Sequence, residues 1–330
     1  MVRDAAGAPI PSTVPGIGAE TDEGLEVDLV SAPSRIWSQL RGDASFWAGA
    51  CVVVGLIALA AGANLIAPYD PNFAIRGSGL MPNGDPVGPT SEFLLGTDRL
   101  GRDYWSRLLH GARTSLTVGI GANLVATMVG TFVGSVAAFA GSPTFRIGTR
   151  RRGRSFAVPV ETILMRLTDV VLSLPVLLLA IALVAIIGPS LLLVTIVIGG
   201  LLWTTTARIV YGRMRLLREL EFVVAARALG ASSYRILWRH VLPHVVSLIV
   251  VYATLGIAAA VLFEAALSFL GVGVPPPAAS WGVMISEHAS YYRTDPRLLM
   301  LPGAAIMLTV LSFNLLGDAL RDALDPHRWR

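Results

Sequence analysis

Few residues in this 330-residue chain have the types and spacing that chemistry requires. His240 and His244 are four residues apart, which places two imidazoles on one helix face and suits a metal ion. No third ligand accompanies them, so we expect no metal site. Gly119 and Gly121 form a GxG pair, but the pair lies in an apolar run and follows no predicted strand. It therefore does not predict a nucleotide-binding loop.

Glu264 is the clearest acidic residue within an apolar stretch. An acid at the centre of a membrane helix costs about 2.5–3.5 kcal/mol on insertion scales, so it is expected to have a use or a partner. Two interpretations stay open: the side chain faces a translocation pathway or partner helix, or it pairs within the chain. Asp169 follows Arg166 by three residues, which predicts a local ion pair.

Enzymatic chemistry is not indicated. No nucleophile and base, and no metal-ligand set, stand out in the apolar stretches, so we expect no catalytic residue. The 26 basic residues are all arginine, and a phosphate-binding GxxxxGK[ST] loop needs a lysine. We therefore expect this chain to bind no ATP and no other cofactor.

The composition is that of a multi-pass membrane protein. Hydrophobic residues make up 54% of the chain and charged residues 15%, whereas soluble domains have about 25% charged residues. Arginines stand next to apolar runs instead of covering one soluble face, so we expect a lipid bilayer and no nucleic acid as a partner. Cys51 is the single cysteine, which excludes an internal disulfide.

Six apolar segments are long enough to cross a membrane, which takes about 20 helical residues. Only helices satisfy their own backbone in lipid over such lengths, so the fold class is predicted to be all-α. The predicted spans are residues 46–66, 114–140, 163–187, 190–209, 245–270 and 298–320.

The arginines predict the orientation, because cytoplasmic loops are enriched in them. With the N-terminus inside, the cytoplasmic segments hold 18 arginines and the outer segments six. We therefore expect loops 141–160 and 210–243 and both termini to be cytoplasmic.

Three regions follow. Residues 1–44 form a polar tail, expected to be disordered apart from a short surface helix at 34–41. Residues 45–111 hold the first span and an extracytoplasmic loop, and residues 112–330 hold the remaining spans. Within the loop, residues 97–110 predict a capped helix at the outer surface, with Tyr104 and Trp105 at headgroup level. Its charges form either a solvated salt-bridge cluster or a surface that receives a binding protein.

The segment 221–243, EFVVAARALGASSYRILWRHVLP, is too polar to span a membrane. It predicts a short helix, a break at Gly230, and a second helix capped by Ser232 or Ser233 that stops near Pro243. Such a helix–turn–helix beneath a bundle suits docking to another protein, although an ordinary amphipathic loop has the same periodicity.

Within this segment, Ala225, Ala226, Gly230, Leu242 and Pro243 resemble the "EAA" loop of ABC-importer permeases. In that family the loop forms the coupling helix, which seats in a groove of the ATPase subunit. Two positions depart from the family pattern, since Val224 replaces a glutamate and His240 replaces an isoleucine. Glu221, one helical turn earlier, is a candidate for the missing carboxylate.

Other motifs narrow the resemblance. Residues 95–103 (LGTDRLGRD), 111–116 (GARTSL), 268–273 (SFLGVG) and 314–318 (NLLGD) are similar to segments of dipeptide, oligopeptide and nickel permeases. The resemblance covers about residues 45–330 and is to the C-type subunit of the pair.

The resemblance implies a type I ABC-importer permease fold in the bacterial inner membrane. It also implies a second permease, two cytoplasmic ATP-binding subunits and an extracytoplasmic solute-binding protein as partners. The alternative is an ion-coupled secondary transporter working alone, which favours repeats and several intramembrane acids. The sequence does not name the solute.

Overall fold

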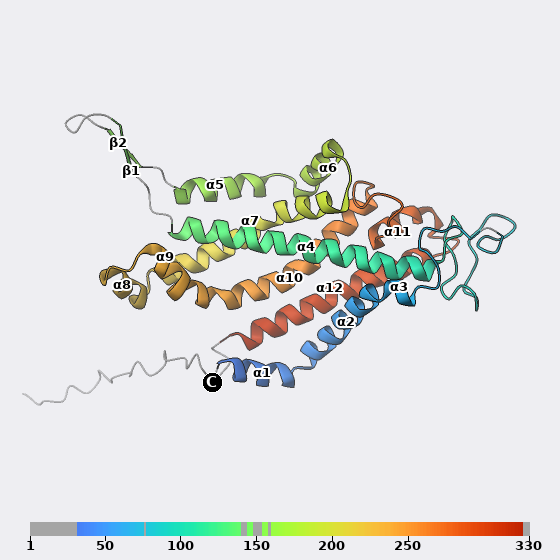
Figure 1. Cartoon of the computed structure of the whole chain (residues 1–330), viewed down its shortest axis with the longest axis horizontal. Helices are drawn as coiled ribbons and strands as arrows, with labels where there is room; N and C mark the ends of the chain where they lie inside the picture. Colours follow the sequence, from blue (N-terminus) through green and yellow to red (C-terminus); the bar gives the residue numbers. More distant parts are fainter. Residues whose placement is uncertain (1–31, 76, 140–143, 148–153, 158–159, 326–330) are drawn as a thin grey trace, which may run out of the picture.

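The computed structural model describes residues 32–75, 77–139, 144–147, 154–157 and 160–325. The tail expected over residues 1–31 and most of the basic loop 141–160 lie outside these described residues. Long helices run side by side, and their connections gather at two opposite ends (Figure 1). We call these the α8 end, where the last described helix (α12, Arg297–Ala323) also ends, and the α11 end, which also holds the loop 67–103.

The described chain starts with three helices: α1 (Ala32–Gly42), α2 (Ala44–Ala61) and α3 (Ala63–Ile66). The short helix expected at residues 34–41 is thus confirmed. Asp43 separates α1 from α2, because its carboxylate caps α2 by accepting from the backbone N–H of Ser45 at 2.7 Å.

The second span begins earlier than predicted. α4 extends over Tyr104–Phe139, and Asp103 caps its first turn by accepting from Ser106 N at 2.8 Å. The separate outer helix predicted at residues 97–110 is therefore wrong, because its C-terminal part is the start of α4. The predicted division of the chain after residue 111 consequently falls inside this helix.

The third span is bent instead of straight. α5 (Val160–Ser173) and α6 (Val176–Ile187) meet at an angle of 87°. Pro175 lies at the bend, where it lacks an N–H to donate and disfavours the helical conformation at Leu174.

Before α5, the strands β1 (Thr144–Ile147) and β2 (Arg154–Ala157) pair antiparallel in a short hairpin. The hairpin projects beyond the bundle at the α8 end (Figure 1). It is the one departure from helical structure among the strands and helices that the structure describes, and it leaves the membrane part all-α.

Beyond α7 (Leu191–Arg218), the chain forms α8 (Glu221–Ala228) and α9 (Ser233–Arg235) and enters α10 (Leu242–Phe269) through a π-helical turn (η1, Ile236–Val241). The predicted stop near Pro243 is wrong, because Pro243 occupies the first turn of α10. A proline there cannot donate to the carbonyl one turn before it, and the wider π turn accommodates that loss.

After α10 the chain re-enters the bundle at the α11 end before it begins α12 (Arg297–Ala323). It forms α11 (Trp281–Glu287) and a 3-10 turn (η2, Ala289–Tyr291). α11 packs against α4, α10 and α12, so this segment is part of the core and not a surface loop.

Small residues let α4 and α7 pack closely, as the Gly130 and Gly134 spacing predicts. A Cβ on Gly130 would lie 2.6 Å from the carbonyl oxygen of Trp203, and one on Gly134 would lie 2.5 Å from that of Ala207. Gly199 meets Ala122 in the same way, at 2.6 Å.

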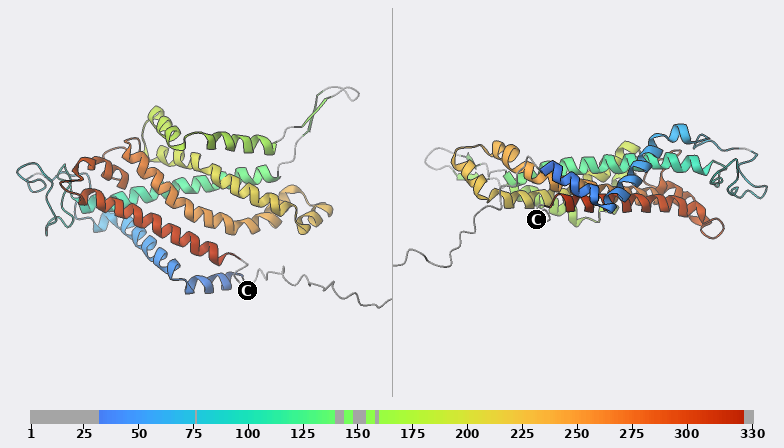
Figure 2. Two further views of the ribbon diagram at one scale, coloured as in Figure 1. Left: turned by 180° about the vertical axis from the view of Figure 1, so that it is seen from behind. Right: turned by 90° about the horizontal axis from the view of Figure 1, so that it is seen from below.

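The described residues contain five helices long and apolar enough to cross a membrane, and six spans if the bent pair α5 and α6 counts as one. Two further views show these helices in a flattened bundle with α1 and the C-terminus at the same end (Figure 2). Only 17% of the apolar window of α2 and 50% of that of α7 are buried. Large apolar faces of these helices therefore remain exposed.

Candidate functional site

The α8 end presents a helical knob that consists of α8, the turn at 229–232 and α9. Gly230 has a φ of +85°. Its N–H donates to the carbonyl of Arg227 at 3.0 Å, and that of Ala231 donates to the carbonyl of Ala226 at 3.1 Å. This pair of bonds is a Schellman motif, which needs a left-handed residue after the helix. The helix break predicted at Gly230 is confirmed.

The returning helix is capped by a serine, as predicted. The hydroxyl of Ser232 accepts from Arg235 N at 3.3 Å, so Ser232 and not Ser233 is the capping residue.

The knob is fixed to the bundle by an apolar cluster. Val223 of α8 and Ile236 and Val241 of η1 are buried, and they join residues at the inner faces of α4, α7 and α10. The cluster also contains Ala138, Val210, Met214, Leu217 and Val245. The knob therefore packs through one apolar cluster against three long helices.

The opposite face of the knob is exposed and largely apolar. Leu229 is 90% exposed and Val224 is 50% exposed. Ala225 is exposed, while Ala226 is half-buried. Exposed apolar side chains that lie close together are typical of surfaces that bind another protein.

The structure brings most of the predicted coupling residues together in this knob. Glu221 is exposed in the first turn of α8, three residues before Val224. Leu242 is half-buried and Pro243 exposed, both in the first turn of α10. They lie behind the knob, on the helix that it is joined to, and not on its exposed face.

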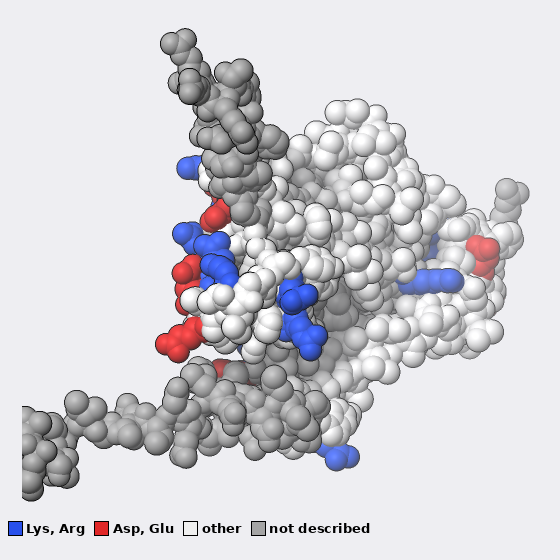
Figure 3. Space-filling view, turned by 60° about the vertical axis from the view of Figure 1, so that its left-hand side comes forward, with Lys and Arg blue, Asp and Glu red and all other residues white. Residues whose placement is uncertain are grey.

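Basic side chains gather at the α8 end, interspersed with a few acids (Figure 3). Asp169 contacts Arg166 at 3.9 Å, so the predicted local pair is present, but it lies closer to Arg208 of α7. These side chains are largely exposed, and such pairs contribute less than about 1 kcal/mol.

The two histidines with metal-like spacing are not brought to a third ligand within the part of the chain that the structure describes. His244 is exposed, and its ring lies 5.5 Å from that of Phe222.

A buried charge network at the α11 end was not predicted from the sequence. Arg107 is fully buried; its guanidinium contacts Glu287 at 2.8 Å and Asp98 at 3.4 Å. Arg102 contacts the same two carboxylates. Tyr104 is also fully buried within the chain, and its hydroxyl donates to the carbonyl of Leu298. The alternative of a solvated salt-bridge cluster is therefore wrong.

The sequence contained only part of the information needed to predict this network. The spacing of Asp98, Arg102 and Arg107 places charges near one another, but Glu287 comes from a segment about 180 residues further along the chain. Asp98 and Glu287 lie with His288 in a cluster of metal-ligand type. Two guanidiniums already neutralise these carboxylates, so the arrangement is an ion-pair network and not a metal centre.

His288 lies fully buried beside this network. Its Nδ1 is 2.7 Å from the carbonyl oxygen of Met284. A carbonyl only accepts, so Nδ1 bears the proton, and Nε2, which has no partner among the described residues, bears the lone pair. Burial lowers the pKa of His288 below its ordinary value, against the opposing effects of the Met284 carbonyl and of Asp98 and Glu287.

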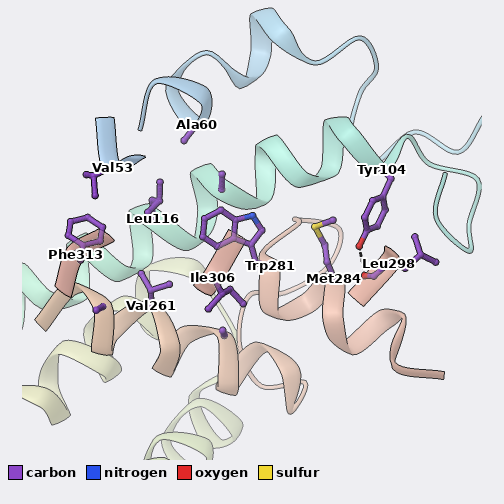
Figure 4. Packing of buried hydrophobic residues seen from close by; sticks show 13 residues of the cluster. Val53, Ala60, Tyr104, Leu116, Val261, Trp281, Met284, Leu298, Ile306 and Phe313 are labelled. Carbon is purple, nitrogen blue, oxygen red and sulfur yellow. Dashed lines mark hydrogen bonds between the residues drawn. The ribbon is translucent and has the colours of Figure 1, made fainter. Parts of the chain in front are cut away.

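Glu264 is fully buried where α4, α10 and α11 meet. Its carboxylate accepts from the hydroxyls of Ser115 at 2.9 Å and Ser268 at 2.7 Å. Figure 4 shows the apolar cluster that α4, α10 and α11 share, in which Leu116, Val261 and Trp281 pack together. The side chain of Glu264 thus has partners within the chain.

Comparisons with known proteins agree with this architecture. Residues 130–330 match the family described as binding-protein-dependent transport system inner membrane component. Residues 33–82 match the N-terminal TM domain of oligopeptide transport permease C.

Individual relatives are similar over most of their length. The chain is 38% identical to the di/tripeptide transport system permease protein DppC of Pseudomonas aeruginosa, over 88% of this chain and 91% of the relative. It is 39% identical to the glutathione transport system permease protein GsiD of Pectobacterium atrosepticum, over 87% of this chain and 88% of the relative. The chain therefore belongs to the family of binding-protein-dependent transport system inner membrane components and is a multi-pass permease subunit with the type I ABC-importer fold, not an enzyme.

Proposed function

We propose that this chain is one of two permease subunits that form the import pathway of an ATP-driven transporter for di- or oligopeptides or a related small solute. The single observation that supports coupling to an ATPase best is the knob at the α8 end, which is exposed and apolar outward and anchored inward. The substrate class is inferred from the printed names of the relatives, which transport di/tripeptides and glutathione.

The proposed mechanism is alternating access. Two partner ATPases bind and hydrolyse ATP, since this sequence has no lysine and so no phosphate-binding loop. Their closure displaces the knob. Because Val223, Ile236 and Val241 pack into one cluster with α4, α7 and α10, these helices move with it.

We place the α8 end in the cytoplasm, together with both termini. The arginines of α7 to η1 and of α1 gather there, and arginine-rich segments stay inside during insertion. The α11 end then faces outward, where the loop 67–103 would receive an extracytoplasmic solute-binding protein. The second permease would cover part of the apolar faces that the spans leave exposed.

An ion-coupled transporter working alone is less well supported. It needs intramembrane acids free to bind the coupling ion. Glu264, the clearest such acid, already accepts two serine hydroxyls.

The test compares two exposed leucines at opposite ends, Leu229 of the knob and Leu94 of the outer loop, which is 67% exposed. The chain is co-expressed with a candidate second permease, candidate ATPases and a candidate binding protein. Leu229→Asp should abolish ATPase co-purification and peptide uptake, whereas Leu94→Asp should leave co-purification intact. Full co-purification with Leu229→Asp would contradict coupling through the knob. Absence of uptake for any di- or tripeptide by the unmodified complex would contradict the solute class.

A further inference from the structure

The re-entrant segment 271–287 is held to the bundle by unusual partners. Three of its backbone N–H groups, at Val274, Trp281 and Val283, donate to serine hydroxyls. Two of the acceptors belong to the bundle, Ser268 of α10 and Ser115 of α4, whereas Ser280 lies within the segment and caps the first turn of α11. Each N to Oγ distance is 3.2 Å.

Two of these hydroxyls converge on one side chain. Ser115 donates to one oxygen of Glu264 at 2.9 Å, and Ser268 donates to the other at 2.7 Å. A serine hydroxyl has one proton and two lone pairs. When its proton is directed to an acceptor, its lone pairs are free to receive an N–H. Each oxygen of Glu264 accepts from one hydroxyl and so sets the direction of Ser115 and Ser268.

We propose that Glu264 is a positioning residue that docks segment 271–287 onto α10 and α4 by orienting Ser268 and Ser115. The carboxylate does not touch the transported solute in this role. It fixes the hydroxyls, and they fix the backbone of the segment. This role rests on the proposed function in one respect only: segment 271–287 then lies at the outer end of the import pathway.

Close packing makes the docked position specific. A Cβ on Gly282 would lie 2.5 Å from the carbonyl oxygen of Ala265, and one on Gly111 would lie 3.2 Å from the ring of Trp281. The segment therefore has no room to slide when a hydrogen bond is lost, and the affected N–H group stays without a partner.

Glu264→Gln tests whether the side chain of Glu264 orients the serine hydroxyls or only fills space in the core. Glu264→Gln keeps the shape, but its amide nitrogen donates where the carboxylate accepted. At least one hydroxyl then loses its acceptor, and a buried polar group without a partner is costly.

The experiment measures backbone hydrogen exchange of the full-length chain in lipid nanodiscs. Glu264→Gln should raise exchange about tenfold or more at Val274 and Trp281 together, as the shared acceptor is lost, and should leave Val283 protected by its own cap, Ser280. Ser268→Ala should raise it at Val274 alone, and Ser115→Ala at Trp281 alone. Glu264→Asp, which keeps an acceptor, should restore part of the protection.

Thr309→Val is the matched control. Thr309 is fully buried in α12, but its hydroxyl donates to Ala305 of its own helix at 2.8 Å. This variant should leave the segment unchanged. Unchanged exchange in both Ser115→Ala and Ser268→Ala would overturn the proposal. These two variants decide the question even if Glu264→Gln fails to fold.

A Glu264→Gln variant that loses uptake while its backbone exchange stays unchanged would also overturn the proposal, and would indicate that Glu264 contacts the solute. Exchange needs no transport, so a wrong substrate class leaves this test intact.

Discussion

Gly230 shows how one residue determines the shape of the candidate coupling site. Its φ of +85° closes the turn of the knob, and a Cβ there would meet nothing within 4 Å. The need for glycine is therefore conformational and not steric within this chain. An ordinary residue in the left-handed region costs roughly 1–2 kcal/mol, more where the side chain is β-branched.

We predict that Gly230→Val leaves membrane insertion unchanged but weakens ATPase attachment and lowers uptake in proportion. Gly212→Val is the control, because Gly212 is exposed in α7 with open space around it. Membrane level, ATPase co-purification and uptake are measured together. Wild-type uptake with full co-purification in Gly230→Val would remove Gly230 from the coupling residues.

His288 gives the α11 end a dependence on pH. Burial lowers its pKa in the folded protein, whereas the pKa of a histidine in the unfolded chain is about 6.5. As the pH falls through this value, the unfolded state takes up a proton that the folded state does not. Stability therefore falls with decreasing pH until the lowered pKa is reached.

We predict that the melting temperature of the solubilised chain declines between pH 7.5 and 5.5, and that His288→Gln reduces the decline. The charged groups around His288 are Asp98, Glu287 and Arg107. His244→Gln, an exposed histidine at the other end, should keep the wild-type slope. Equal slopes for wild type and His288→Gln would assign the pH dependence to other groups.

Among the elements, the contact between the outer loop and α11 depends on buried ion pairs. Arg107 of α4 joins Asp98 of the loop to Glu287 of α11. Removing one partner of a buried pair leaves an uncompensated charge and costs about 3–5 kcal/mol. Breaking an exposed ion pair costs less than about 1 kcal/mol of stability.

Arg107→Met should therefore lower the melting temperature markedly and make the loop 67–103 sensitive to protease. Arg99→Met, at an exposed position of the same loop, should do neither. Limited proteolysis in nanodiscs checks the loop directly. If both variants are cleaved at the same rate, the ion pairs do not hold the loop to α11.

For the whole molecule, the orientation is the property to test. Ser233 is exposed at the α8 end and Ser91 at the α11 end. In a Cys51→Ser background, a cysteine at 91 should react with an impermeant thiol reagent in spheroplasts, and one at 233 should react only after lysis. Labelling of 233 in intact spheroplasts with protection of 91 would reverse the proposed topology.

The sequence by itself determined the membrane class, the helical fold and the approximate spans, because lipid demands long apolar helices whatever their neighbours. It also located the turn at Gly230, since a helix end is encoded within a few residues. The tertiary structure decided which elements meet. In the folded chain, the third span bends at Pro175 and Tyr104 is buried. The helix also continues from α9 through η1 into α10, with Pro243 in the first turn of α10.

The partners of buried polar groups were likewise decided only in three dimensions. Ser115, which hydrogen-bonds Glu264, comes from another helix. Glu287, which forms an ion pair with Arg107, comes from a distant segment of the chain. Sequence periodicity shows that such a side chain faces inward, but it does not show what faces it. A hydrogen bond forms between side chains that packing brings within about 3 Å, and that packing depends on contacts between residues far apart in the chain.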